Sequence, residues 1–454
     1  MDKLINSDME SAVKPTSLST LVVLVLFSLS SSIWASPDLG GYVETDTRWR
    51  PGDNEQYTWN ENRLGLKIDV QSEGAAGYGE LRFRNQGFAD ISQSDQLCDG
   101  DRIQPSRLEI YEGYVDIYGF LFDNLDMRIG KQRVAWGTAD KLNVVDNLNP
   151  DDFEDILDFS LKLPTVSLRL DYYPGDFIVT AVMIPVFTPA RSLPQSWQAP
   201  IRLPLPSDMD LRTLDDEVIL PDNRPQESAA FGIRIKKAIV NYDWSLSYVY
   251  NRDEWAIPTT LGITKDSASD SVDVHMTLEY PRQHVVGMDM AGTIGDVGVW
   301  AEGALFLPEK KIYTRVTFPE ETQEQLALDN KPYLKYVVGG DYTFRNGIYI
   351  NAQYLHGFFT DRGAGNLEDY FLIAFEKKFF HEDLKVRTVF AAEVANFSDF
   401  KDHSAFFGGP EVTYYPRDNV ELIAGSFLLE GDTSTQFGQF KSNDEIYIKV
   451  KYSF

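Results

Sequence analysis

Charged side chains of both signs recur at alternate positions along several stretches of this 454-residue chain. The chemistry they could support is electrostatic, because cationic groups facing carboxylates across a passage create a field that sorts ions and polar solutes. The candidate side chains are Arg82, Arg84, Arg128, Lys131, Gln132 and Arg169 on one side, and Asp146, Asp151, Asp152 and Asp155 on the other. A purely structural and solubilising role for these charges stays open.

Catalytic, metal and cofactor chemistry finds little support in the sequence. Cys98 is the only cysteine, so an internal disulfide and a thiolate metal cluster are excluded, and no haem-attachment motif is present. The acidic stretch lacks the spacing of a calcium-binding EF-hand loop. Neither H-E-x-x-H nor G-x-S-x-G accompanies the five histidines, which are His275, His284, His356, His381 and His403. We therefore predict no catalytic residue, no metal and no cofactor, and keep a hydrolase with a Ser–His pair as an alternative, since such pairs depend on geometry.

The elements that must position the charges are predicted strands. In the last eleven residues, apolar side chains at Ile446, Ile448, Val450 and two further alternate positions are interleaved with polar ones, which predicts a strand with one apolar and one polar face. The same alternation predicts strands at 43–50, 63–70, 80–84, 108–118, 124–135, 164–173, 176–187, 230–238, 242–251, 284–292, 297–306, 333–342, 348–356, 369–379, 384–394, 407–415, 420–430 and 444–454.

Short turns and long connections alternate between these strands, as at Pro174-Gly175 and then at 188–228. Transmembrane β-barrels keep their periplasmic turns short and their extracellular loops long. We therefore predict an all-β fold, a single closed antiparallel transmembrane β-barrel of about 18 strands over residues 36–454. The stretch 271–280 has the apolar phase of the strand that follows it, so it either extends that strand beyond the membrane or adds one.

Two loops carry specific expectations. Residues 138–163 hold the candidate carboxylates, and 151–158 could form a short amphipathic helix. We expect this loop to fold into the barrel and set its narrowest point, facing some of the four candidate arginines; packing outside on other loops is the alternative. Residues 188–228 carry seven prolines, so we expect no sheet and no long helix there.

The amino terminus and the overall charge restrict the class of protein further. Lys3, Lys14, an apolar run at 21–29 and a small-residue site ending at Ala35 predict a signal peptide at 1–35. A net charge of −27 argues against a nucleic-acid partner. The chain is thus expected to be exported.

A short motif carries a family resemblance. The sequence RIGKQ from Arg128 to Gln132, followed by Trp136-Gly137, resembles the R-x-G-[KR]-Q-x-x-x-W-G stretch of a family of Gram-negative outer-membrane barrels with unassigned substrates. Its G-[KR]-Q-R part is similar to alginate-export barrels, whose basic constriction is at odds with the acidity of this chain. The resemblance implies passage of a solute through a barrel, with Arg128, Lys131, Gln132 and Arg133 at or near the lumen. Gly130, between two inward polar side chains, is expected to leave room against the wall for a solute or for the inward loop, or to form a bulge, and we favour the loop.

The terminal strand ending at Phe454 resembles the strand that closes outer-membrane barrels against their first strand. This resemblance implies the outer membrane of a Gram-negative bacterium, with outer-membrane lipid, lipopolysaccharide and the barrel-assembly machinery as partners. We expect a channel or porin passing a polar solute or polymer, and no enzyme. The alternative is a structural sleeve or scaffold for an export or electron-transfer complex.

Overall fold

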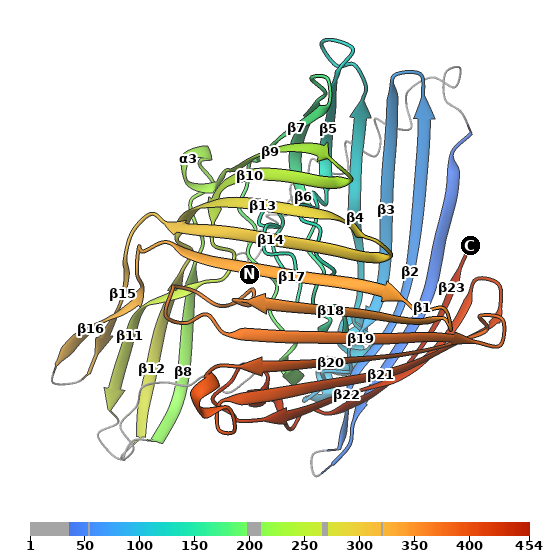
Figure 1. The fold of residues 1–454 in the computed structure, drawn as a ribbon. Coiled ribbons are helices and arrows are strands. Elements are labelled where there is room, and N and C mark those ends of the chain that lie inside the picture. The colour runs from blue at the N-terminus through green and yellow to red at the C-terminus, as the bar shows by residue number, and fades with distance from the viewer. Residues whose placement is uncertain (1–35, 53–54, 198–209, 266–270, 319–320) are drawn as a thin grey trace, which may run out of the picture.

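The computed structural model describes residues 36–454 apart from 53–54, 198–209, 266–270 and 319–320, so the predicted signal peptide lies outside the described residues. The described strands form an 18-stranded sheet and a five-stranded sheet (Figure 1). Helices are short, and none within the described residues is long and apolar enough to cross a bilayer.

The 18-stranded sheet consists of long antiparallel strands. They are β1 (Asp38–Arg50), β2 (Gln56–Ser72), β3 (Ala75–Gln86), β4 (Ser106–Ile117), β5 (Leu125–Gln132), β6 (Thr165–Tyr172), β7 (Phe177–Ile184), β9 (Ala230–Ile239), β10 (Tyr242–Arg252), β13 (Arg282–Ile294), β14 (Val297–Pro308), β17 (Tyr333–Thr343), β18 (Ile348–His356), β19 (Asp369–Phe379), β20 (Leu384–Val394), β21 (Ser404–Arg417), β22 (Val420–Gly431) and β23 (Glu445–Ser453). The helical turns are η1 (Ser94–Cys98), α2 (Gly100–Ile103), η2 (Ile156–Asp158), η3 (Gln195–Trp197), α3 (Pro225–Ser228), η4 (Phe397–Asp399) and η5 (Gly438–Phe440).

The first and last strands close this sheet into a barrel. β1 and β23 are antiparallel, in a register that runs from Tyr42 opposite Ser453 to Trp49 opposite Ile446. Beyond that ladder, the backbone N–H of Gly41 donates to the carbonyl oxygen of Phe454 at 2.8 Å, and the N–H of Phe454 donates to the carbonyl oxygen of Gly41 at 2.9 Å. The prediction of a closed antiparallel barrel of about 18 strands is confirmed.

Alternating burial along each strand separates two faces. On β23, Ile446, Ile448 and Val450 are exposed, whereas Glu445 and Tyr447 between them are buried. The same outward exposure of large apolar side chains recurs around the barrel. An apolar outer belt over a polar interior is the pattern of a barrel that spans a membrane.

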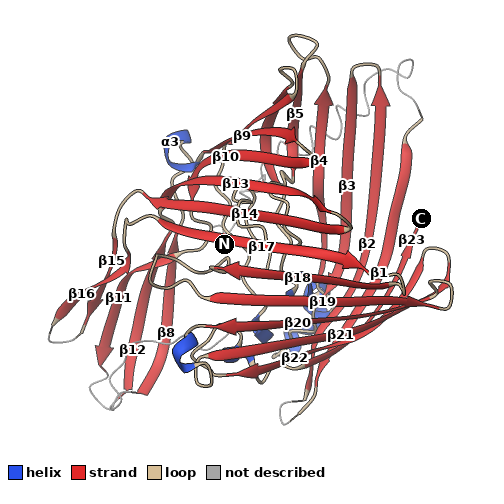
Figure 2. Ribbon diagram, in the orientation of Figure 1, coloured by secondary structure: helices blue, strands red, loops and turns tan. Residues whose placement is uncertain are grey.

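The five-stranded sheet lies beyond the barrel strands at the end of the long loops (Figure 2). Its order is β16 (Thr322–Leu328), β15 (Ile312–Thr317), β11 (Ile257–Lys265), β12 (Ser271–Glu279) and β8 (Asp210–Ile219). These strands come from three different loops, those after β7, β10 and β14. Leu261, Ile263, Val272, Val274, Met276 and Val316 form its apolar cluster.

Two expectations about loops need correction, and one open alternative is decided. The segment 188–228 does contain sheet, because Asp210–Ile219 is a proline-free stretch that pairs with β12 in parallel. The stretch 271–280 forms β12, which belongs to the outer sheet rather than to the barrel, so it lies beyond the membrane strands. The helix expected at 151–158 is reduced to one 3-10 turn, η2.

Candidate transport site in the barrel lumen

The connection from β5 to β6 runs inside the barrel. Glu302, on the inward face of β14, accepts hydrogen bonds from the backbone N–H groups of Thr138 and Ala139 and from the Asn143 side chain, the last two at 2.7 and 3.0 Å. The carbonyl oxygen of Asp140 accepts a hydrogen bond from Nε2 of Gln353 on β18 at 2.9 Å. The loop therefore crosses to the wall that faces the end of β5. We refer to residues 133–164 as the inner loop.

The Trp-Gly pair of the motif starts this crossing. Trp136 is buried against β9, where a Cβ added to Gly232 would lie 2.8 Å from the indole ring. Gly137 has a φ of +97°, and a Cβ there would lie 2.5 Å from a carboxylate oxygen of Glu302. Only glycine combines this backbone with such close approach. The pair thus directs the chain into the lumen.

One side of the lumen is filled with apolar side chains. Inner-loop residues such as Leu142 and Val145 pack with inward side chains of the barrel wall, including Val285 and Val337. The remaining buried members are Val134, Trp136, Ala139, Val144, Leu148, Val182, Ile184, Val249, Ile257, Ala304, Phe306, Ile312, Leu328, Tyr333, Leu355 and Tyr370. Arginines on β2, β3 and β5, such as Arg63, Arg82 and Arg128, keep partial exposure on the opposite side.

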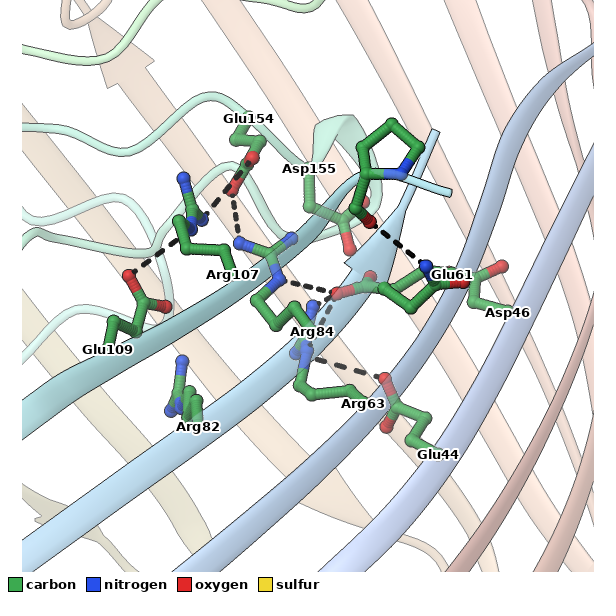
Figure 3. A network of polar contacts seen from close by, with 12 residues as sticks. Glu44, Asp46, Glu61, Arg63, Arg82, Arg84, Arg107, Glu109, Glu154 and Asp155 are labelled. Atoms are coloured by element: carbon green, nitrogen blue, oxygen red, sulfur yellow. Dashed lines mark hydrogen bonds and ion pairs between the residues drawn. The ribbon is translucent and has the colours of Figure 1, made fainter. Parts of the chain in front are cut away.

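The opposite wall carries a row of arginines across three neighbouring strands (Figure 3). Arg63 of β2 lies opposite Arg84 of β3, and Arg84 lies opposite Arg107 of β4. Like charges in this relation repel, so counter-charges are required. Glu61 accepts from Nη2 of Arg63 at 2.9 Å and from Nε of Arg84 at 2.6 Å, while Glu154 of the inner loop accepts from Nη1 of Arg84 at 2.8 Å.

A finger of the inner loop bearing its carboxylates reaches this wall. The finger begins and ends at Asp151 and Lys162, which form an antiparallel bridge and an ion pair at 2.5 Å. Asp155 lies 2.7 Å from Nη1 of Arg48 on β1 and 3.8 Å from Nζ of Lys449 on β23. Asp152 pairs at 3.4 Å with Arg191 from the loop after β7.

Burial and neighbouring charges shift the pKa of acids in the finger and at its base. Burial would raise the pKa of Asp155, but Arg48 and Lys449 hold that pKa below its usual range. At the base of the finger, burial and the neighbouring Asp151 carboxylate raise the pKa of Glu254 well above normal. Glu254 also accepts a hydrogen bond from the backbone N–H of Asp151 at 2.8 Å. Asp155 is therefore a firmly charged contact.

Most of the predicted arginines pair within the wall instead of with the inner loop. Of the four, Arg84 meets a carboxylate of the acidic loop, that of Glu154, as expected for some of these arginines. The other three contacts are Arg82 with Glu80 at 2.6 Å, Arg128 with Asp116 at 2.6 Å, and Arg169 with Asp171 at 2.8 Å. The candidate Asp146 pairs with Arg133 at the start of the inner loop.

The three other motif positions, Gly130, Lys131 and Gln132, contact the backbone of neighbouring strands. Nζ of Lys131 donates to the carbonyl oxygen of Ile110 at 2.8 Å, and Gln132 is buried with its amide on the carbonyl oxygen of Ser167 at 3.1 Å. Gly130 has a φ of +139°, and a Cβ there would lie 2.3 Å from the carbonyl oxygen of Gly113. The expectation that Gly130 accommodates the inner loop is wrong, because the backbone of β4 occupies that space.

Sequence reasoning missed several residues that fix the lumen. Glu302 was not a candidate, and neither was Trp197, whose Nε1 donates at 2.8 Å to Glu445 inside the barrel. Arg48 and Lys449 lie on the inward faces of their strands, and the alternation of polar and apolar residues in the sequence did indicate this. No local signal identifies Glu302 or Trp197, since their partners are more than 150 residues away in the chain.

One histidine, His356, takes part in a small polar cluster on β18 and β19. Nδ1 of His356 lies 2.8 Å from Asp369, next to Tyr354 and above the outward-facing Phe371. Across the described part of the chain, no group of three or more histidine, cysteine or acidic side chains is arranged to hold a metal ion.

Comparisons with known proteins point to the same fold. No family model and no curated protein sequence matches this chain. Among solved structures, OccK8 (OprE) of Pseudomonas aeruginosa is similar with a TM-score of 0.50 at 9% identity, over 92% of this chain and 98% of that chain. OccAB3 of Acinetobacter baumannii aligns with a TM-score of 0.48 at 10% identity, over 92% and 99% of the two chains. Salmonella typhi OmpF, solved with daunomycin, aligns with a TM-score of 0.40 at 10% identity, over 92% and 97%. At such low identity the likeness concerns the fold, which is that of a porin-like outer-membrane β-barrel.

Proposed function

We propose that this protein is a passive outer-membrane channel for polar solutes. Its narrowest part lies between the inner loop and the wall of β1 to β4. The observation that carries the proposal is the two-sided attachment of the inner loop, to Glu302 and apolar side chains on one side and to Arg48 and Arg84 on the other. A loop held across a polar lumen limits the size of what passes and presents fixed charges to it.

Placement in the outer membrane is supported by two independent features. The outward side chains at mid-strand, such as Leu66, Phe83 and Ile129, are apolar and exposed. The sheet is closed, so no strand edge is left unpaired in lipid. Both features are what a barrel in a bilayer requires.

The alternative of a sleeve around a partner fits the lumen less well. Besides the inner loop, Trp197 from the loop after β7 donates to Glu445, and the backbone N–H of Phe437 from the loop after β22 donates to Glu393 at 2.6 Å. Loops of the chain itself therefore occupy the space that a threaded protein would need.

Removal of the finger tests the proposal. Replacing 152–161 by two glycines between Asp151 and Lys162 leaves the attachment at Glu302 in place and removes Glu154 and Asp155. We expect a higher single-channel conductance in planar bilayers. A full-length variant in which Asp152, Glu154 and Asp155 become amides is the matched control. It removes the charges of the finger and keeps its volume, so it separates the effect of charge from that of size.

The outcomes are distinct. A purified, inserted parent protein without channel activity would overturn the proposal. A shortened variant that inserts normally and conducts like the parent would show that the constriction lies elsewhere.

A further inference from the structure

In most ion pairs on the inward faces of β1 to β6 and β23, and in one pair within the inner loop, the cation is more exposed than the carboxylate. Arg63 retains 18% exposure beside Glu61 with 2%, Arg82 retains 18% beside Glu80 with 4%, and Arg133 retains 26% beside Asp146 with 3%. The same order holds for four further pairs, Arg128 with Asp116, Arg169 with Asp171, Arg107 with Glu109 and Lys449 with Asp46. A solute in the lumen therefore meets cations before carboxylates.

In two contacts of this wall the carboxylate is more exposed than the cation, and both contacts involve the finger. Arg48 is less exposed than Asp155, and Arg84 is less exposed than Glu154. These two arginines hold the inner loop against the wall, so they are covered by it. Glu44 and Arg63 are about equally exposed.

Side-chain length explains the general order. An Asp or Glu carboxylate accepts hydrogen bonds close to the wall, whereas an arginine extends further and donates back from its Nε and Nη atoms. Arg128 does this with Asp116, to which Nε and Nη2 donate at 2.6 and 2.9 Å. Two carboxylates on the opposite wall, Glu302 and Glu393, are also withdrawn, because they are buried under loop amides.

From this geometry we infer that the lumen selects anionic solutes, despite the net charge of −27 of the whole chain. The binding groups are partly exposed guanidiniums, chiefly Arg63, Arg82 and Arg107 near the finger and Arg128 further along. Guanidinium groups bind carboxylate and phosphate oxygens in the same way, through parallel N–H donors. The inference rests on the proposed channel function and adds the charge class of its solute.

The net charge of the chain predicts a cation-selective pore, whereas the charges exposed in the lumen predict an anion-selective one. A single measurement of ion selectivity therefore decides between them. The full-length protein is inserted in planar bilayers with a potassium chloride gradient, and the reversal potential is recorded. We expect the sign of an anion-selective pore. Succinate and inorganic phosphate, added separately, distinguish a carboxylate from a phosphate preference by which one reduces the chloride current.

Two charge-removing variants test the residues. Arg107→Gln removes an exposed guanidinium at the end of the arginine row, and Arg63→Gln removes one from its other end. A unit charge about 6 Å away in a water-like dielectric raises the local anion concentration about three-fold and lowers the local cation concentration about three-fold, so we expect the anion-to-cation preference to fall about ten-fold per variant. Arg224→Gln is the control, because Arg224 is an exposed, paired arginine next to α3, outside the lumen.

The failures can be told apart. A conducting parent protein with cation selectivity, or Arg107→Gln and Arg63→Gln channels with unchanged reversal potential, overturns the inference and leaves the channel function standing. Absence of any conductance contradicts the channel function itself. Arg107 is half exposed, so its variant should fold even if Arg63→Gln does not.

Discussion

Glu302 is predicted to decide whether the inner loop stays across the lumen. Its carboxylate accepts three hydrogen bonds from Thr138, Ala139 and Asn143, with a longer fourth from the backbone N–H of Val145 at 3.4 Å. Glu302 is buried, with 3% exposure, so no water takes over these donors while the loop is docked. The perturbations are Glu302→Ala and the milder Glu302→Gln.

The magnitude follows from the number of donors. Hydrogen bonds to a charged group contribute about 1.5–3 kcal/mol each, and part of that is recovered when the freed loop meets water. We expect Glu302→Ala to weaken loop docking by about 3–5 kcal/mol, and Glu302→Gln, which keeps one acceptor oxygen, by about 1–3 kcal/mol. The barrel itself should be little affected, since its strands keep their ladders.

Amide hydrogen exchange and conductance measure this effect. The amides of Thr138, Ala139 and Val145 should exchange about 150- to 4,000-fold faster in Glu302→Ala. Single-channel conductance should rise or fluctuate. Glu376→Gln is the control, because Glu376 has the inward parity on β19 and makes no hydrogen bond to a loop in the described part of the chain. The reasoning fails if Glu302→Ala inserts normally with parental exchange rates and conductance.

Three further predictions concern assembly, faces and pH. Phe454→Ala should lower the amount of heat-modifiable barrel in the membrane fraction, because the last residue bonds to the first strand; normal insertion would contradict this role. Leu66→Arg, on the outward face, should cost about 2–4 kcal/mol of barrel stability in denaturant titrations, whereas Lys67→Gln should cost little, and equal losses would mean the faces are assigned wrongly. The pKa of Asp155 is depressed in the folded protein, so its contribution to loop docking is complete above the usual carboxyl pKa near 4 and is lost as pH falls through the lower folded pKa. Conductance should therefore become less uniform only under strongly acidic conditions. Arg48→Gln should move the onset of this change to higher pH, because Arg48 is the ion-pair partner of Asp155.

The barrel could be predicted because its signal is repeated in every strand. Each segment such as 333–342 or 384–394 carries the period of two that a membrane strand imposes, and short turns fix which neighbours pair. The outer sheet could not be predicted in the same way. β15 has six residues and β16 seven, and β8 has three consecutive acidic residues at 215–217, so the pattern is brief or interrupted.

The inner loop was recognisable, but its partners were not. An acidic segment with an apolar side after a strand requires burial, and this is a local property of 138–163. Which cation meets Asp155 depends on the closure of β1 on β23, which brings Arg48 and Lys449 together from opposite ends of the chain. Pairing of this kind is a product of strand order and stagger, and no spacing in the sequence encodes it.

The five-stranded sheet has a consequence for how the exposed rim responds to proteases. Its strands come from three loops and are joined by ladders, with β12 held between β8 and β11 and β15 between β11 and β16. A cut between β11 and β12, or between β15 and β16, therefore breaks a covalent bond without freeing a peptide, since the strand on each side of the cut remains paired in the sheet. The rim should stay assembled after nicking, and fragments should separate only on denaturation.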